Sequence, residues 1–202
     1  MSTITLNLET DFVELPQPVL SPTMSLQQAF KSRHSARTFS AEPLSIETLS
    51  ALLWSGFGVN RQDEMSGRTA PSAHNWQEIS VFAVLPEGAF RYDAREHRLM
   101  LIKAEDLRAA TGTQDFVGSA PLNLVYVADF SRMREVQAGD QAFLAGADTG
   151  FIAQNVYLYC ASAGLATVVR ALIDRRRLAT ALGLSKTERI TLAQSVGSMR
   201  VS

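Results

Sequence analysis

Residues 149–169 read TGFIAQNVYLYCASAGLATVV, a stretch of twenty-one residues without a charged side chain. About 20 apolar residues are enough to cross a bilayer, so the length alone would allow a membrane span. Two glycines, two side-chain amides and a serine interrupt the stretch, and the residues after Gly164 are typical of a strand. The sequence therefore predicts a central helix from about Asp140 to Ala163, buried on all sides, followed by a strand from Leu165 to Leu172.

Short apolar runs elsewhere in the chain are typical of buried strands. They span residues 79–85, 122–127 and 190–196. Residues 90–93 and 98–102 flank a polar turn of four residues, which predicts a hairpin. Because the strands are grouped and do not alternate regularly with helices, the pattern favours an α+β fold over a doubly wound sheet.

Short helices are predicted where a capping residue precedes apolar residues at helical spacing. Ser25 followed by Gln28 is a capping-box pattern, while Ser45 and Asp174 each begin a further helical segment. The expected helices start at Ser25, Ser45, Glu105 and Asp174 and end near residues 33, 56, 110 and 183. Residues 60–71 are polar and are expected to form a loop.

Composition predicts one globular domain over residues 1–202, with an extended arm over 1–24 that contains a short strand at 4–8. The chain is 46% hydrophobic and carries 20 acidic and 19 basic residues, which argues against disorder and against a nucleic-acid partner. Its single cysteine, Cys160, excludes an internal disulfide, and its three histidines are not spaced as zinc ligands. No secretory signal is apparent at the start, so we expect a cytoplasmic protein.

The segment Arg33-His34-Ser35-Ala36-Arg37 places two guanidinium groups and a hydroxyl within five residues. Arginine offers fixed donors that match phosphate oxygens, and a serine hydroxyl can complete the set. The segment suits a phosphate site, but the residues alone favour a solvated basic loop that neutralises nearby carboxylates, since surface arginines are common and their ion pairs are weak.

A second polar segment, Pro71-Ser72-Ala73-His74-Asn75-Trp76-Gln77, precedes a predicted buried strand. The amides of Asn75 and Gln77 present both donors and acceptors, as the edge of a heteroaromatic ring requires. The alternative, which the segment taken by itself favours, is that both amides only form hydrogen bonds within the turn and at the strand edge.

Several other positions have a structural interpretation. Gln154 and Asn155, inside the apolar helix, are each expected to find a hydrogen-bond partner. Gly164 can end the helix or let the backbone approach a flat ligand. Cys160 is expected to be an inert buried thiol and His97 only a turn residue. Walker A, nucleophile-elbow and dinucleotide-binding motifs are absent.

Taken in order, these segments resemble those of the nitroreductase superfamily of FMN-dependent oxidoreductases. Residues 33–39 are similar to its Arg-x-Ser-x-Arg-x-Phe motif, which holds the FMN phosphate and ribityl chain. Residues 71–77 are similar to its Pro-Ser-x-x-Asn-x-Gln loop, which the partner subunit supplies in that family. Residues 150–158 and 164–167 resemble the core dimer helix and a turn whose backbone faces the flavin N5 region.

The resemblance implies a homodimer with a central, mostly antiparallel sheet flanked by helices and FMN at the interface. It also implies ping-pong hydride transfer from NADH or NADPH to the flavin and then to a small electron-poor acceptor such as a nitro compound or quinone. Residues 52–60 resemble the branch that includes azoline-oxidising enzymes. The residues that the resemblance assigns to cofactor binding are Arg33, His34, Ser35, Arg37, Pro71, Ser72, Ala73, Asn75, Gln77, Gly164, Leu165, Ala166 and Arg200.

The chain departs from the family pattern in two places, and other functions are left open. Glu78 follows Gln77 where the family often has proline, and residues 197–199 replace its usual Gly-Tyr-Pro. One alternative is a flavin-dependent dehydrogenase or oxidase of a ring or peptide substrate. Others are a non-catalytic flavin-binding carrier and, more remotely, a module for phosphorylated ligands or nucleic acid.

Overall fold

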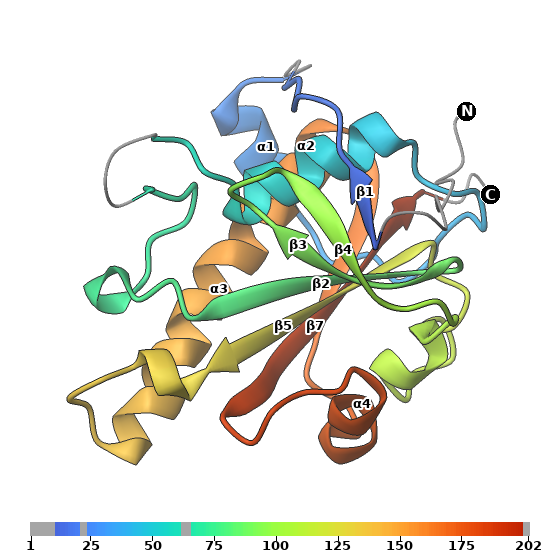
Figure 1. Ribbon diagram of the computed structural model, residues 1–202. Coiled ribbons are helices and arrows are strands. Elements are labelled where there is room, and N and C mark those ends of the chain that lie inside the picture. Colours follow the sequence, from blue (N-terminus) through green and yellow to red (C-terminus); the bar gives the residue numbers. More distant parts are fainter. Residues whose placement is uncertain (1–10, 21–23, 62–65, 200–202) are drawn as a thin grey trace.

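The computed structural model describes residues 11–20, 24–61 and 66–199 and confirms the α+β fold (Figure 1). Within these ranges seven strands form one sheet in the order β1-β4-β3-β2-β5-β7-β6, with every neighbouring pair antiparallel. The strands are β1 (Phe12–Glu14), β2 (Ile79–Leu85), β3 (Gly88–Asp93), β4 (Arg98–Lys103), β5 (Leu122–Asp129), β6 (Leu165–Arg170) and β7 (Glu188–Ser198). The strand expected over 4–8 lies outside the described residues.

Three of the helices in the described residues begin where a capping residue predicts, and the central helix begins two residues before its predicted start at Asp140. They are α1 (Leu26–Ser32), α2 (Ile46–Phe57), α3 (Ala138–Ser162) and α4 (Arg175–Ala181), with short 3-10 turns η1 (Ala73–Asn75), η2 (Arg108–Thr111) and η3 (Phe130–Arg132). Ser25 and Gln28 form the predicted capping box, and the side chains of Ser45 and Asp174 cap α2 and α4. The helix expected over 105–110 is wrong in position and type, because the Asp106 carboxylate accepts the Arg108 N–H at 3.0 Å and only the η2 turn follows.

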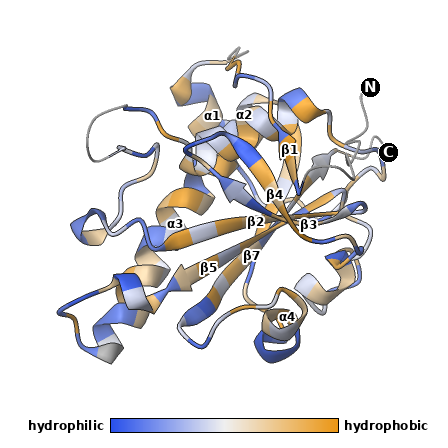
Figure 2. Ribbon diagram, in the orientation of Figure 1, coloured by the Kyte–Doolittle hydropathy of each residue, from blue (hydrophilic) through white to orange (hydrophobic). Residues whose placement is uncertain are grey.

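Apolar side chains cover both faces of the sheet. On one face, Val81 packs in a core with Leu52 of α2 and Ile152 of α3. On the other face, Phe82 packs in a smaller core with Leu178 of α4. Figure 2 shows the hydrophobic residues concentrated along the strands, with hydrophilic residues toward the outer loops. The sheet is therefore a buried scaffold that places the loops at its ends and edges.

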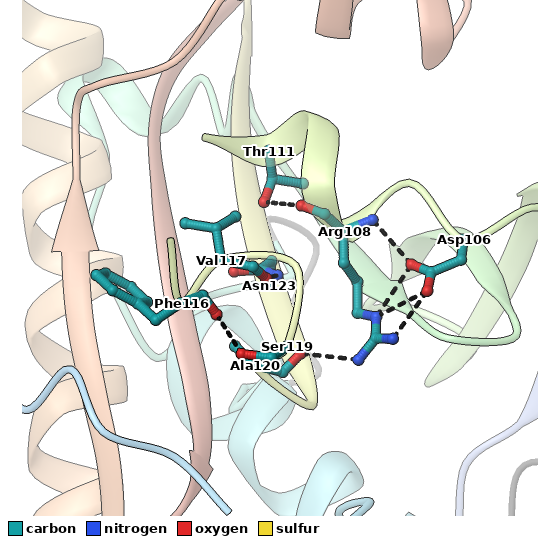
Figure 3. A network of polar contacts seen from close by, with 8 residues as sticks. All are labelled: Asp106, Arg108, Thr111, Phe116, Val117, Ser119, Ala120 and Asn123. Carbon is teal, nitrogen blue, oxygen red and sulfur yellow. Dashed lines mark hydrogen bonds and ion pairs between the residues drawn. The ribbon is translucent and has the colours of Figure 1, made fainter. Parts of the chain in front are cut away.

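The connection between β4 and β5 is fixed by side-chain hydrogen bonds (Figure 3). The Arg108 guanidinium pairs with Asp106 at 2.8 Å and donates to the Ala120 carbonyl at 3.1 Å. Asn123, the second residue of β5, donates through Nδ2 to the Val117 carbonyl at 2.9 Å. These hydrogen bonds thus fix the loop between β4 and β5 and attach it to β5.

Arg170, the last residue of β6, buries its guanidinium among neutral oxygens and is 3% exposed. It donates to the Thr111 carbonyl at 2.9 Å, to Asn123 Oδ1 at 2.8 Å and to Ser195 Oγ at 3.0 Å. Burial lowers the pKa of Arg170 to about 10. The hydrogen bonds join β5, β6, β7 and the η2 turn through one buried cation.

The central helix α3 is buried on one side only, which corrects the expectation of burial on all sides. Val156 and Cys160 are buried, whereas Phe143 and Phe151 are 73% and 48% exposed. A β-carbon built at Gly150 would meet no neighbouring atom within 4 Å. No helix within the described ranges is long and apolar enough to span a membrane. The helix therefore has an apolar, open outer face in the single chain.

His97 does more than form the turn between β3 and β4, contrary to expectation. Its ring contacts the Ser50 hydroxyl at 2.7 Å, the Pro16 carbonyl at 3.1 Å and the Tyr92 hydroxyl at 2.8 Å. Burial lowers the pKa of His97. The imidazole therefore joins the N-terminal arm, α2 and the hairpin. Cys160 has the expected buried thiol, and burial raises its pKa.

Candidate active site

The segment of residues 33–40 lies along the outer edge of the sheet. The Ala36 N–H donates to the Thr167 carbonyl of β6 at 2.9 Å, and the Ser40 N–H donates to the Ser198 carbonyl of β7 at 2.9 Å. Because β6 is an edge strand, this segment covers an otherwise unpaired row of backbone groups. The segment also places Arg33, Ser35 and Arg37, which are predicted to bind phosphate, beside the end of α3 and the start of β6.

Tyr157 of α3 holds the segment in place. Its hydroxyl lies 2.8 Å from Ser35 Oγ and accepts the Val169 N–H at 3.0 Å. The phenolic proton is therefore free to be donated to Ser35, since the Val169 bond uses only an oxygen lone pair. The Arg33 guanidinium lies over the Tyr157 ring, 5.2 Å from its centroid. Sequence reasoning missed Tyr157, whose only signal was a polar hydroxyl within an uncharged helix.

The arginines of this segment differ in their surroundings. Arg33 is half-buried against Tyr157, whereas Arg37 is exposed and makes no side-chain hydrogen bond or ion pair within the described part of the chain. His34 is exposed, with Nδ1 2.8 Å from the Ser32 carbonyl. A small cavity of about 70 Å³ adjoins His34 and Tyr157. The arrangement leaves one guanidinium available to an anion and fixes the other by stacking.

The Gly164 turn closes α3 next to this segment. Gly164 has a φ of +68°, in the left-handed region, and a β-carbon there would meet no atom within 4 Å. Leu165 is half-buried and Ala166 is buried as β6 begins. The glycine therefore serves as the predicted helix stop and also leaves the backbone open to close approach.

A larger hollow of about 560 Å³ opens between the N-terminal arm, α1, α2 and α3. It is lined mostly by apolar side chains, among them Leu26, Trp54 and Leu158, with Asn60 as a polar contributor. Ser162 and Ala163, which also line the hollow, immediately precede Gly164. A small organic molecule held there would therefore lie close to the Gly164 turn.

The second predicted segment, residues 71–77, is a strained turn. His74, Asn75 and Gln77 have φ values of 49°, 53° and 49°, in the left-handed region that costs non-glycine residues on the order of 1 kcal/mol each. Ser72 Oγ accepts the Gln77 N–H at 3.0 Å and helps to hold this shape. Pro71, the first residue of the segment, is exposed.

The two amides of this turn have different roles. Gln77 is 6% exposed and its amide accepts from Arg68 at 2.9 Å and donates to Asn75 Oδ1 at 3.2 Å. For Gln77 the geometry therefore favours the alternative of hydrogen bonding within the turn. Asn75 is exposed, and within the described residues its Nδ2 has no hydrogen-bond partner. Asn75 is thus the amide available to a ligand.

The two segments contact opposite sides of α3. The Ala73 N–H donates to Asp148 Oδ2 at 2.8 Å, and Ser35 contacts Tyr157. Nine residues separate Asp148 from Tyr157, which corresponds to about two and a half turns and about 13 Å along the helix axis. Within one chain, residues 33–37 and Asn75 therefore lie on opposite sides of α3. Arg200 lies outside the described residues.

The helix residues Gln154 and Asn155 also differ from each other. Asn155 donates through Nδ2 to the Thr69 carbonyl at 3.2 Å, as its burial in the helix predicted. Gln154 was expected to be buried and to need a hydrogen-bond partner. It is instead exposed on the outer face of α3, where water can satisfy its amide.

Removal of the Tyr157 hydroxyl should loosen the edge of the sheet. Tyr157→Phe leaves the half-buried Val169 N–H unpaired, so we expect the free energy of unfolding in urea to fall by about 1 to 2 kcal/mol. Tyr159→Phe is the matched control, because the Tyr159 hydroxyl makes only a long 3.4 Å bond to the Thr48 carbonyl. Equal losses in the two variants would contradict this role of Tyr157.

Comparison with known proteins agrees with the fold and with the order of the segments. The sequence model described as the Nitroreductase family matches residues 30–198. A protein of Methanocaldococcus jannaschii, named as a nitroreductase, is 30% identical over 169 residues, which cover 78% of this chain and 83% of the other. A Ralstonia eutropha crystal structure, also described as a nitroreductase, is 42% identical with a TM-score of 0.91, covering 98% of this chain and 93% of that one.

A more distant structure shares the fold alone. The Escherichia coli microcin synthetase McbBCD complex, solved with truncated pro-MccB17 bound, contains a chain that is 19% identical with a TM-score of 0.72; the match covers 100% of this chain and 85% of that one. The family match spans most of the chain, from α1 to the end of β7. This chain therefore belongs to the nitroreductase family, a family of oxidoreductases.

Proposed function

We propose that the protein is an FMN-dependent oxidoreductase that uses NADH or NADPH to reduce small electron-poor organic acceptors, such as nitro compounds and quinones, by a ping-pong mechanism. The observation that carries the proposal is the Arg33–Arg37 segment, held on the sheet edge beside the open Gly164 turn. FMN would supply the hydride chemistry, while the protein binds and orients it.

The described residues fit an FMN phosphate and a flat ring. Arg37 offers a guanidinium without a partner among these residues, Arg33 a second cation stacked on Tyr157, and Ser35 a fixed hydroxyl. Gly164 leaves room for close approach of the ring, and Leu165 and Ala166 continue that backbone. These side chains bind and orient the cofactor. No side chain is assigned to proton transfer.

We further propose that Asn75 reaches the flavin of a partner subunit in a homodimer. Its segment contacts the opposite side of α3 from residues 33–37, which supports a site that a second chain completes. The outer face of α3 suits that pairing. Phe143 and Phe151 are exposed there, and Gly146 and Gly150 leave space for a second backbone. In a twofold dimer each chain would complete the site of the other.

Replacement of Arg37 tests the cofactor assignment directly. We expect Arg37→Ala to weaken FMN binding by about tenfold to a hundredfold, the value of one lost charge-assisted hydrogen bond. The measurement is the dissociation constant from quenching of flavin fluorescence, together with the flavin content after desalting. Arg95→Ala, which removes another exposed arginine, is the control. Unchanged flavin affinity in Arg37→Ala would contradict the assignment.

The electron donor is tested on the reconstituted protein without oxygen. Bleaching of the flavin spectrum by NADH or NADPH would support the reductase. A flavin that stays oxidised with both would favour the dehydrogenase or the carrier. The apolar hollow beside Gly164 supports a small-molecule acceptor.

The azoline-oxidase-like branch, the single domain and the cytoplasmic location stay predictions from the sequence.

A further inference from the structure

Glu78 is a fully buried carboxylic acid directly after the 71–77 segment. Its side chain is 0% exposed, and neither carboxyl oxygen accepts a hydrogen bond from another of the described residues. An ionised carboxylate in such a place would lose its hydration with no donor from a neighbouring residue in exchange. The environment therefore favours the protonated acid.

The charged groups that face Glu78 come from two elements. Asp148 of α3 is 2% exposed, and its carboxyl group is within hydrogen-bond reach of Glu78. Arg132 of η3 is the nearby cation, but its side chain is exposed, so water screens its effect. Burial is the main cause that raises the pKa of Glu78 to about 7; the Asp148 carboxylate adds to the rise, while the Glu78 N–H and Arg132 oppose it in part.

The pair is connected to the strained turn. Asp148 Oδ2 accepts the Ala73 N–H at 2.8 Å, and the main chain of Glu78 is fixed by the Asp129 N–H, which donates to the Glu78 carbonyl at 3.0 Å. Two carboxylates in contact repel each other when neither carries a proton. A single proton shared by the two groups forms an O–H···O hydrogen bond. Asp148 then keeps its position and continues to accept the Ala73 N–H.

We propose that Glu78 and Asp148 form a proton-held latch on the 71–77 segment: Glu78 donates its proton to Asp148, and Asp148 accepts the Ala73 N–H and so positions Asn75. The inference rests on the proposed function, in which Asn75 contacts the flavin. Glu78 is a positioning residue in this scheme, since it acts through Asp148 and the backbone. Loss of the proton releases the turn and weakens FMN binding.

The first test is the pH profile of FMN affinity in the full-length protein. With a pKa of about 7, the latch is closed below neutral pH and opens above it, so the wild-type dissociation constant should be about tenfold higher at pH 8 than at pH 6. Glu78→Gln keeps an N–H donor for Asp148 without a titrating proton. Its dissociation constant should stay near the low-pH wild-type value at both pH values. Glu96→Gln removes one exposed carboxylate and should keep the wild-type profile.

The second test does not depend on FMN. Hydrogen exchange of the Ala73 amide in the cofactor-free protein, corrected for the intrinsic effect of pH, should accelerate about tenfold from pH 6 to pH 8 in the wild type. In Glu78→Gln the corrected rate should not change. If the amide behaves in this way but no variant binds FMN, the latch stands and the proposed function fails.

The outcome that overturns the latch is the same pH dependence of Ala73 exchange in the wild type and in Glu78→Gln. If Glu78→Gln does not fold, Asp148→Asn takes its place, because an asparagine can accept from Ala73 and donate to an ionised Glu78. Asp148→Asn should also show a flat profile. A wild-type slope that persists in Asp148→Asn would equally overturn the proposal.

Discussion

Replacement of Phe151 by aspartate is expected to convert the protein into a monomer that no longer retains FMN. Phe151 is 48% exposed on the outer face of α3, where a partner helix is proposed to pack. A carboxylate buried there would lose its hydration, which costs several kcal/mol, so we expect association to weaken by at least about a hundredfold. Because Asn75 would then no longer reach the partner's cofactor, flavin should be lost with the dimer. Sedimentation velocity and the flavin absorbance measure both effects.

The control for this substitution is Ile102→Asp, which places the same charge on an exposed apolar residue of β4, 40% exposed and away from α3. Phe151→Asp should remain folded by circular dichroism, since half of the side chain already faces solvent in the single chain. A folded Phe151→Asp that sediments as a dimer with flavin bound would refute the proposed interface.

Asn123→Leu is expected to lower the free energy of unfolding by about 3 to 5 kcal/mol, because it breaks a fully buried polar network around a cation. Asn123 Oδ1 accepts from the Arg170 guanidinium at 2.8 Å and from Ser195 Oγ at 2.6 Å. Leucine has a similar volume but removes the acceptor that the two donors share, at a position that is 0% exposed. Urea unfolding provides the measurement.

A double-mutant cycle separates the network from simple packing. In an Arg170→Met background the guanidinium is already absent, so Asn123→Leu should cost less than half of its value in the wild type. Equal costs in the two backgrounds, or a loss under about 1 kcal/mol in the single variant, would mean that the buried cation does not depend on Asn123.

Most elements of the fold could be predicted from the sequence because their signals are local. Ser25, Ser45 and Asp174 cap their helices through hydrogen bonds to residues only three positions away. The buried strands are apolar on both sides, since helices cover both faces of the sheet. The strand β1 was missed because three residues that pair at a sheet edge have no periodicity to detect.

Only part of the candidate site could be predicted, because a sequence motif identifies residues but does not give their positions in the folded chain. Arg33, Ser35 and Asn75 could be chosen from local pattern and family resemblance. Tyr157 could not, because its contact with Ser35 spans 122 residues of sequence. The exposed face of α3 was mistaken for a buried one, since an uncharged helix has the same composition against its own sheet and against a second chain.

The hydrogen bonds from the 33–40 segment to the edge of the sheet have a consequence for solubility. β6 is a terminal strand rich in β-branched residues, and a strand of this kind is a template for pairing with another molecule. The Ala36 and Ser40 amides occupy acceptors on β6 and β7, so the segment proposed to bind phosphate also blocks that template. If FMN binds this segment as proposed, loss of the cofactor would loosen the segment and expose β6, so the protein without FMN should aggregate first through β6.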